Sequence, residues 1–210
     1  MTSATWYFDF ISPFAYLQLP YLRGLRERVN VTPVPIVFGA VLSHHGQLGP
    51  AEIAGKREFT YRFVQWQADN AGITLRFPPA HPFNSLAALR LCVAVGGSWT
   101  AVEAIFAHVW RDGGDATNAD ALAAVARELG VDDVNAAIAD AGVKQALRDN
   151  TEQAIARGVF GVPTLAFGDL LFWGNDASAM VDAWLRDPAL FDGARYIALH
   201  GLPSGVERRR

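Results

Sequence analysis

The chain has 210 residues, of which 51% are hydrophobic and 19% charged, and its formal net charge is −3. This composition is typical of a globular protein with a substantial core, and it lacks the basic excess of a nucleic-acid binder. No apolar run approaches the roughly 20 residues that span a membrane. We therefore expect neither nucleic-acid nor membrane partners. Because Met1 leads into the first expected strand without a signal-peptide pattern, we expect a cytoplasmic protein.

The first quarter of the chain predicts a strand, a helix and a second strand. Residues 4–10 alternate and are rich in aromatic side chains, which favours a strand. Leucines near helical spacing predict a helix over 13–28. The next strand, 31–37, contains two prolines, so we expect it at a sheet edge or on an irregular course. Residues 38–50 are interpreted as a loop.

Helical periodicity then dominates until the last quarter of the chain. Helices are expected over 52–71, from 84 onward, and over 99–110, 120–129, 134–141 and 143–157. Asn118 is expected to cap the helix at 120–129. Strands at 165–167 and 170–172 flank Gly168-Asp169, which indicates a hairpin. A final helix is expected up to residue 185, capped by Asp176.

Ser12-Pro13 lies where the first strand meets the first helix. Proline is favoured in the first turn of a helix, so Ser12 is placed at the helix N-terminus. Free backbone donors and the positive end of the helix dipole meet there and favour a bound anion. On this segment alone, Ser12 is interpreted as an N-cap. The remaining motifs of the chain shift the interpretation toward a functional role.

The only cysteine is Cys92, in the apolar helical segment 86–95. An internal disulfide is therefore impossible, and a buried, inert thiol is the expected state.

Three stretches together resemble one known family. They are Phe8-Asp-Phe-Ile-Ser-Pro-Phe-Ala-Tyr-Leu17, Gly158-Val-Phe-Gly-Val-Pro-Thr164 and Phe172-Trp-Gly-Asn-Asp176. The Gly-rich turn, proline and following strand predict a fixed backbone corner that is compatible with a cis bond before Pro163. The chain resembles the thioredoxin fold in its DsbA-like form with a helical insertion. Within it, the chain is similar to 2-hydroxychromene-2-carboxylate isomerases and to kappa-class glutathione transferases.

The resemblance implies an α/β architecture with an interrupted thioredoxin-like domain. That domain would comprise 1–40 and 143–190, with a helical insertion over 50–142 and a C-terminal extension over 191–210. The usual Cys-x-x-Cys of thioredoxins is replaced by Ser12-Pro13-Phe14-Ala15. Any sulfur chemistry must therefore use a thiol from a bound molecule.

The same resemblance implies that glutathione is the cofactor. The positions implied to bind it are Ser12, Gln47, Val162, Trp173, Gly174, Asn175 and Asp176. Ser12 would be the catalytic residue, because its hydroxyl and the helix N-terminus stabilise a thiolate. Val162 would pair through its backbone with the cysteinyl unit, and Asp176 would hold the γ-glutamyl ammonium. Gln47 matches a loop position where relatives carry Asn, near the glycyl end. The expected Arg after Asp176 is Ala177 here.

At the expected substrate-binding positions, this chain departs from the family pattern. Relatives carry a lysine near Ser43 and His44 that suits a substrate carboxylate, whereas this chain has Ser-His-His. Asn84 matches a family asparagine at a helix start, as a cap or as a residue that lines the site. His81 is interpreted as an ordinary surface or core histidine. No metal site is expected, because adjacent histidines without further ligands make a poor ligand set.

The resemblance implies an enzyme of aromatic degradation, a glutathione-dependent isomerase. It would interconvert 2-hydroxychromene-2-carboxylate and trans-o-hydroxybenzylidenepyruvate by reversible thiolate addition, ring opening and bond rotation. The expected partners are a small aromatic carboxylate and a second copy of the chain. A kappa-like transferase or peroxidase that consumes glutathione remains an alternative, as does a non-catalytic module that binds thiols or peptides.

Overall fold

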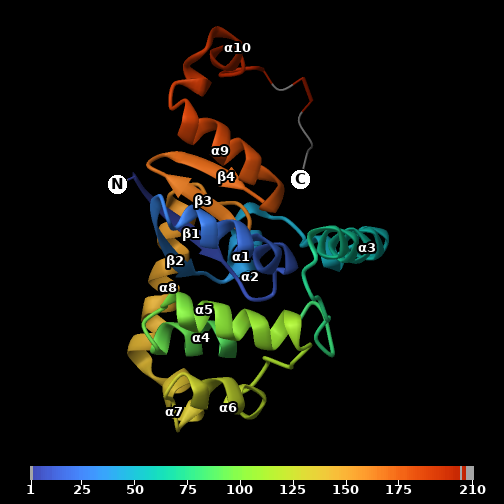
Figure 1. Ribbon diagram of the computed structural model, residues 1–210, viewed down its shortest axis with the longest axis vertical. Coiled ribbons are helices and arrows are strands. Elements are labelled where there is room, and N and C mark those ends of the chain that lie inside the picture. The colour runs from blue at the N-terminus through green and yellow to red at the C-terminus, as the bar shows by residue number, and fades with distance from the viewer. Residues whose placement is uncertain (1, 204, 207–210) are drawn as a thin grey trace.

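A mixed four-stranded sheet lies at the centre of the computed structural model, which describes residues 2–203, 205 and 206 (Figure 1). Its strands are β1 (Thr2–Phe8), β2 (Val29–Pro35), β3 (Thr164–Phe167) and β4 (Leu170–Trp173). Their order is β2-β1-β3-β4, with β2 parallel to β1 and the other neighbours antiparallel. The expected edge position of the proline-containing strand is confirmed, since prolines cannot donate to a second neighbouring strand.

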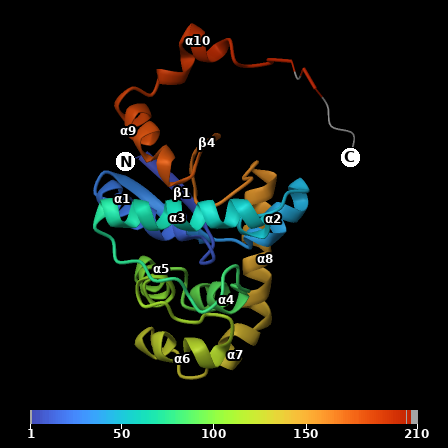
Figure 2. The same cartoon turned by 90° about the vertical axis from the view of Figure 1, so that its right-hand side faces the viewer.

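Ten α-helices surround this sheet in the described part of the chain. They are α1 (Pro13–Leu25), α2 (Phe38–His45), α3 (Ala54–Ala71), α4 (Leu86–Ala94), α5 (Trp99–Phe106), α6 (Ala119–Glu128), α7 (Val134–Ala139), α8 (Ala141–Ala156), α9 (Ser178–Arg186) and α10 (Ala194–Ile197). The layer of α4 to α7 lies toward the β2 edge of the sheet, and α9 and α10 lie toward the β4 edge (Figure 1). Figure 2 shows α3 on the outside of the sheet layer, with α2 beside it. No helix among the described residues is long and apolar enough to cross a membrane.

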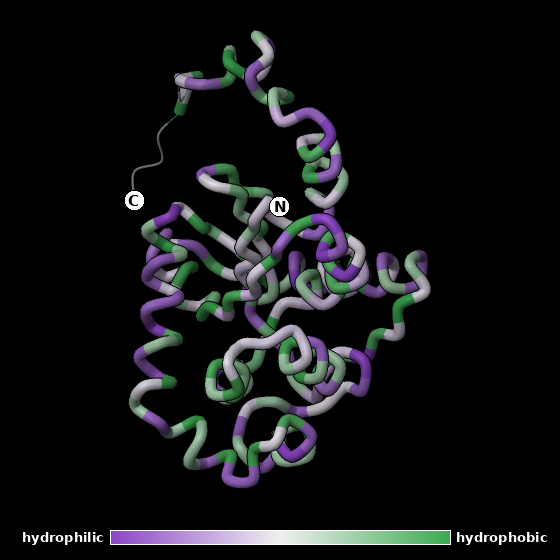
Figure 3. The backbone as a smooth tube through the Cα atoms, turned by 60° about the vertical axis from the view of Figure 1, so that its left-hand side comes forward, coloured by the Kyte–Doolittle hydropathy of each residue, from purple (hydrophilic) through white to green (hydrophobic). Residues whose placement is uncertain are grey.

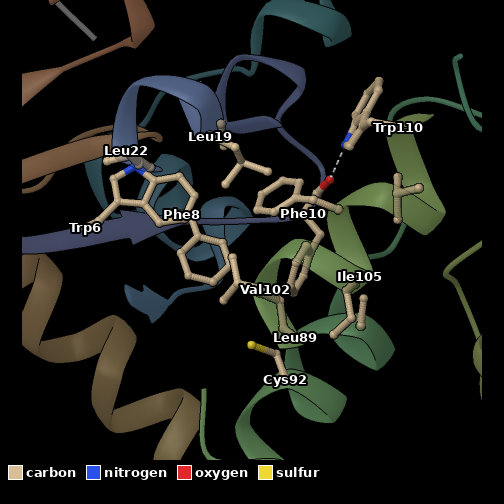
Figure 4. Close-up of a cluster of buried hydrophobic side chains, with 14 of the residues drawn as sticks. Trp6, Phe8, Phe10, Leu19, Leu22, Leu89, Cys92, Val102, Ile105 and Trp110 are labelled. Carbon is tan, nitrogen blue, oxygen red and sulfur yellow. Dashed lines mark hydrogen bonds between the residues drawn. The ribbon is translucent and has the colours of Figure 1, made fainter. Parts of the chain in front are cut away.

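The alternating side chains of β1 build two separate cores. Trp6 and Phe8 are fully buried and stacked on one face, and Phe10 packs edge-on against Phe8 beyond the end of the strand. Figure 4 shows this cluster between α1 and the helices α4 and α5. Tyr7 points to the opposite face and packs with Val41 of α2. Because successive strand residues point to opposite faces, one aromatic strand supports both layers.

The outer helices show the one-sided pattern expected of surface helices. In α8, the buried positions Leu147, Thr151 and Ala154 recur at helical spacing. Figure 3 shows the same alternation as hydrophilic and hydrophobic turns along that helix. The expected cap of α6 is confirmed, since the Asn118 side chain accepts from the Ala121 N–H at 3.0 Å.

The expected helix at 99–110 is confirmed, as α5 followed by a π-helical turn over Ala107–Arg111. Two other expectations about local structure are wrong. Residues 38–50, interpreted as a loop, begin with helix α2, which ends where Gly46 adopts a φ of 60°. Asp176 does not cap the last helix of this region. It lies in a 3₁₀ turn over Asn175–Ala177, and α9 begins only at Ser178.

Candidate active site

Ser12 occupies the start of α1 and borders a cavity. Its backbone is extended, and its Oγ accepts a hydrogen bond from the Ala15 N–H at 3.3 Å, so the N-cap interpretation is confirmed. The side chain is 7% exposed and lines the cavity. No acceptor for its hydroxyl hydrogen exists among the described residues. Ser12 can therefore cap the helix with its oxygen and still donate to a bound ligand.

The turn before Ser12 is held by two ring N–H groups. The indole Nε1 of Trp110 donates to the Phe10 carbonyl at 2.8 Å (Figure 4). His81 Nε2 lies 2.9 Å from the Ile11 carbonyl. A carbonyl oxygen can only accept, so Nε2 of His81 carries a hydrogen. Both carbonyl groups that precede Ser12 are thus held by hydrogen bonds, which restricts the conformation of the turn and the direction of the Ser12 side chain.

Asp9 joins this turn to two neighbouring helices. One carboxyl oxygen accepts from the Ile11 N–H at 3.1 Å and the other from the Phe38 N–H of α2 at 2.9 Å. Burial raises the pKa of the Asp9 carboxyl, while hydrogen bonds from the Ser85 side chain and from backbone N–H groups lower it. The carboxyl group therefore ties the β1–α1 turn to the starts of α2 and α4.

His81 is a site residue that the sequence did not identify. Its Nδ1 lies 2.8 Å from the Tyr61 hydroxyl, whose single hydrogen can be donated either to Nδ1 or to the His81 carbonyl, 2.7 Å away. Burial lowers the pKa of His81, so the neutral ring is favoured. The ring borders the cavity, whereas the sequence indicated an ordinary histidine. The peptide bond between His81 and Pro82 is cis, and the His-Pro pair is the only local signal for this arrangement.

The cavity has a volume of about 420 Å³ and is mainly apolar. Its large apolar side chains are Phe14, Phe38, Leu42, Leu48, Phe160 and Trp173. Its polar side chains are Ser12, Gln47, Glu52, Lys56, Thr60 and His81. An apolar chamber with a few polar groups is typical of sites for small organic ligands. Of the predicted site residues, Ser12, Gln47, Val162 and Trp173 are brought together here.

The loop before β3 forms the wall beside Ser12. The Val162-Pro163 bond is cis, and neither the N–H nor the C=O of Val162 has a partner among the described residues. These groups are available to an extended ligand chain. The indole of Trp173 lies over Gly161, where a Cβ atom would be only 2.4 Å from Nε1. Phe160 packs edge-on against Trp173, with ring centroids 5.3 Å apart.

The segment from Gly174 to Asp176 lies next to this loop but outside the lining of the cavity. The Gly174 N–H donates to the Pro163 carbonyl at 2.8 Å. Gly174 has a φ of 92°, and a Cβ atom there would be 2.4 Å from Oδ1 of Asp176. Glycine is therefore required both by the backbone conformation and by the carboxylate that lies over it.

Gln18 is a second residue that the sequence did not identify. It is 1% exposed, and its Oε1 accepts from the Trp6 indole at 2.8 Å. Its Nε2 donates to the Gly174 carbonyl and to Ser178 Oγ, both at 3.3 Å. This amide thus connects the core of β1, through α1, to the segment expected to hold the γ-glutamyl group.

The three residues expected to bind substrate do not line the cavity. The exposed Ser43 donates to the Gly39 carbonyl at 2.9 Å, and the exposed His44 packs against His45. The exposed Asn84 accepts from the Leu86 N–H at 3.1 Å, one position before the N-cap Ser85 of α4. The cause is helix α2, because Gly39 and Leu42, three residues apart, face the cavity and turn Ser43 and His44 away. Lys56 and Thr60, on one face of α3, line it instead.

Cys92 lies in α4, away from this site. It is fully buried, and burial raises the pKa of its thiol to about 12. The expected inert thiol is thus consistent with the structure (Figure 4). The described residues contain no group of three or more His, Cys, Asp or Glu side chains that could hold a metal ion.

Comparison with known proteins agrees with the fold and the motifs. The DSBA-like thioredoxin domain family matches residues 5–186. A 2-hydroxychromene-2-carboxylate isomerase of Pseudomonas putida is 31% identical over 84% of this chain and 91% of its own. A glutathione S-transferase kappa 2 of Caenorhabditis elegans is 28% identical over 87% of this chain and 91% of its own. A solved 2-hydroxychromene-2-carboxylate isomerase superposes with a TM-score of 0.78 at 27% identity, covering 90% of this chain and 97% of that one. The chain therefore belongs to the DSBA-like thioredoxin domain family and, within it, to the 2-hydroxychromene-2-carboxylate isomerases.

Proposed function

We propose that this protein is a glutathione-dependent isomerase that interconverts 2-hydroxychromene-2-carboxylate and trans-o-hydroxybenzylidenepyruvate. The observation that carries the proposal is the Ser12 hydroxyl, which can donate into an apolar cavity beside the unpaired backbone of Val162. The chain's own sulfur is buried in α4 and cannot serve this site. Family membership supports the reaction, since relatives carry this name.

The residues present fit glutathione. The backbone of Val162 suits the cysteinyl unit, and Asn175 with Asp176 suits the γ-glutamyl end beyond Gly174. Gln47, which also lines the cavity, suits the glycyl end. When bound, glutathione supplies the nucleophilic sulfur that the site lacks. The kappa-class relative supports this cofactor.

The chain's own residues provide stabilisation, packing and exclusion of water. Ser12 donates toward the position of the thiol, and the N-terminus of α1 adds a favourable partial charge, so both favour the thiolate. Phe14, Phe160 and Trp173 present aromatic surfaces to a flat substrate and keep water from it. The fixed turn behind Ser12 lets its donor act without reorganisation, which is what electrostatic stabilisation requires.

Product analysis tests this function and separates it from its alternatives. Purified protein is mixed with 2-hydroxychromene-2-carboxylate, with and without glutathione, and both substrate and free thiol are followed. Isomerase activity requires glutathione and leaves its concentration unchanged. Consumption of glutathione would favour the kappa-like transferase or peroxidase, which the kappa-class relative makes the second candidate. Tight glutathione binding without turnover on any electrophile would favour a non-catalytic binding module.

We also propose that the protein acts as a homodimer in the cytoplasm, where the glutathione pool is reduced. Association is supported by stacked rings on α3. Phe59, Phe63 and Trp66 follow one another with centroid spacings of 5.8 and 5.9 Å, and Phe59 and Trp66 are 62% and 59% exposed. Exposed apolar surface of this kind is typical of interfaces. Light scattering after size exclusion should give the mass of two chains, and a monomer mass would refute the dimer.

A further inference from the structure

A segment near the C-terminus projects from the body of the molecule (Figure 1). It comprises residues 193–203, which we call the C-terminal arm, and it lies beyond residue 186, where the match to the family domain ends. Every residue of the arm is exposed, and its side chains Ile197, Leu199 and Leu202 belong to no apolar cluster of the described residues. Exposed apolar side chains gathered in one short segment indicate a surface that packs against another one.

The arm is anchored close to the wall of the cavity. Phe191, just before the arm, packs against Phe172 of β4 with ring centroids 6.1 Å apart. The next residue of this edge strand, Trp173, lines the cavity. An extended chain from Gly193 to Leu202 spans at most about 30 Å, whereas packed layers of a protein are about 10 Å apart. The arm is therefore long enough to pass β4 and reach the opening of the cavity.

The arm also turns back toward the helices that border the cavity. Figure 1 shows the chain after α10 turning to the side of α3, and Figure 2 shows the same stretch turning toward α2. Both helices contribute residues to the cavity wall. Leu48, Phe160 and Trp173, which we call the rim, line the cavity and are also exposed, so its apolar lining is open to solvent there. The chain thus has two exposed apolar surfaces, the arm and the rim, within reach of each other.

A bound ligand changes the balance between an open and a closed arm. Closing the arm orders about ten residues, which costs conformational entropy. Burial of apolar surface must offset that cost, and an aromatic ligand in the cavity adds apolar surface to that of the rim. A closed arm also excludes water from the reacting atoms, as mobile segments do in many enzymes. Closure is therefore expected to accompany binding of the ligand.

We propose that the C-terminal arm closes over the cavity of its own chain and that Leu199 and Leu202 form a wall above a bound aromatic ligand. The proposal rests on the proposed function for the identity of that ligand. It commits to the arm's own chain, because the arm is anchored on the strand that carries Trp173 and turns toward the walls of the same cavity. The arm would thus favour ligands with apolar surface over small polar ones.

Disulfide trapping tests closure without relying on turnover. The only native thiol, Cys92, is buried and its pKa is raised to about 12, so it stays unreactive. The test variant combines Leu48→Cys at the rim with His200→Cys on the arm. The matched control combines Asp132→Cys with His200→Cys, because Asp132 is equally exposed but precedes α7, at the opposite end of the molecule from α10 (Figure 1). Both are oxidised with and without 2-hydroxycinnamate and S-methylglutathione.

The 48–200 pair should form an intrachain disulfide about tenfold faster than the 132–200 pair, because the bond requires Cβ atoms within about 4.5 Å of each other. The two ligands should accelerate it further, and Leu199→Ser with Leu202→Ser should slow it. Equal rates for the two pairs would overturn the proposal. So would disulfides that join two chains, which would assign the arm to a second copy, or bound ligands that leave the rate unchanged.

Calorimetry measures what the arm contributes to ligand affinity. Leu199→Ser with Leu202→Ser should weaken binding of 2-hydroxycinnamate by about tenfold, because two apolar side chains no longer cover it. Met180→Ser makes the same kind of change at an exposed position of α9 outside the cavity and should have no effect. Unchanged affinity in the arm variant would contradict the proposed wall. If wild-type protein binds neither ligand, the proposed function fails, and the trapping rates without ligand still decide whether the arm closes.

Discussion

Replacing Ser12 by alanine removes two interactions whose effects can be separated. As a cap, the Oγ accepts from Ala15 at 3.3 Å, and losing a cap costs about 1 kcal/mol of stability. As a donor, the hydroxyl would contact a thiolate, and a hydrogen bond to a charged group contributes about 1.5–3 kcal/mol. Each 1.4 kcal/mol is a factor of ten, so turnover should fall by about 10- to 150-fold. This lies within the range of about 10- to 1000-fold for one stabilising donor.

Ser98 provides a matched control for the cap. It is the N-cap of α5 and accepts from the Ala101 N–H at 3.3 Å, the same distance as in the Ser12 cap, but it lies outside the cavity. Both alanine variants should lose similar stability in urea, and only Ser12→Ala should lose turnover at saturating glutathione. The pKa of the bound thiol should also rise in Ser12→Ala, which ultraviolet thiolate absorbance measures, while glutathione affinity changes less. Wild-type turnover in this variant would exclude Ser12 from the chemistry.

The remaining predictions concern Asp176, Gln18 and Cys92. Asp176→Ala should raise the KM for glutathione by about 10- to 100-fold and leave the rate at saturating glutathione unchanged, because a contact that is equally strong in the ground and transition states affects only KM. A large fall in the saturated rate with an unchanged KM would place Asp176 at the reacting centre. Gln18→Leu should lower the free energy of unfolding, measured with urea, by about 1–3 kcal/mol, because it leaves the buried Trp6 indole without an acceptor. Unchanged stability would contradict a structural role for the hydrogen bonds of Gln18. Cys92→Ala should keep its turnover per folded molecule and lose roughly 1–2 kcal/mol in the free energy of unfolding. A variant that folds but is inactive would refute the conclusion that the reacting sulfur comes from a bound molecule. Since burial raises the pKa of Cys92 from 9.0 to about 12, the stability of wild type relative to Cys92→Ala should fall as pH rises through that window.

Much of the fold was predictable because its signals are local. The strand before Ser12, the edge strand with its prolines and the hairpin at Gly168 each depend on a few neighbouring residues. Helix α2 was missed because its apolar part, from Phe38 to Leu42, is too short to show a period. Its stability depends on contacts that the sequence does not display, such as the Asp9 carboxylate at its first N–H and the buried Val41.

The residues of the candidate site also fall into two groups, those that local sequence patterns predict and those that depend on distant contacts. Ser12 and Val162 could be predicted, since a Ser-Pro step and a Gly-rich turn before proline describe their backbone directly. His81 and Gln18 could not, because their roles come from contacts across the fold. His81 contacts a carbonyl 70 positions earlier, and Gln18 contacts one 156 positions later. An isolated histidine or glutamine carries no sequence signal for such a partner.

Long-range contacts also determine how well Ser12 can act. A donor stabilises a developing or existing charge only if its direction is fixed before the ligand arrives. That direction is set by Trp110 in the π-helical turn and by His81, neither of which needs to touch the sulfur. Substituting Trp110 would release the Phe10 carbonyl and disturb the fully buried core at the same time. Under the proposed function, the contribution of the Ser12 hydroxyl would thus depend on the helical layer packed against its turn as much as on the helix that carries it.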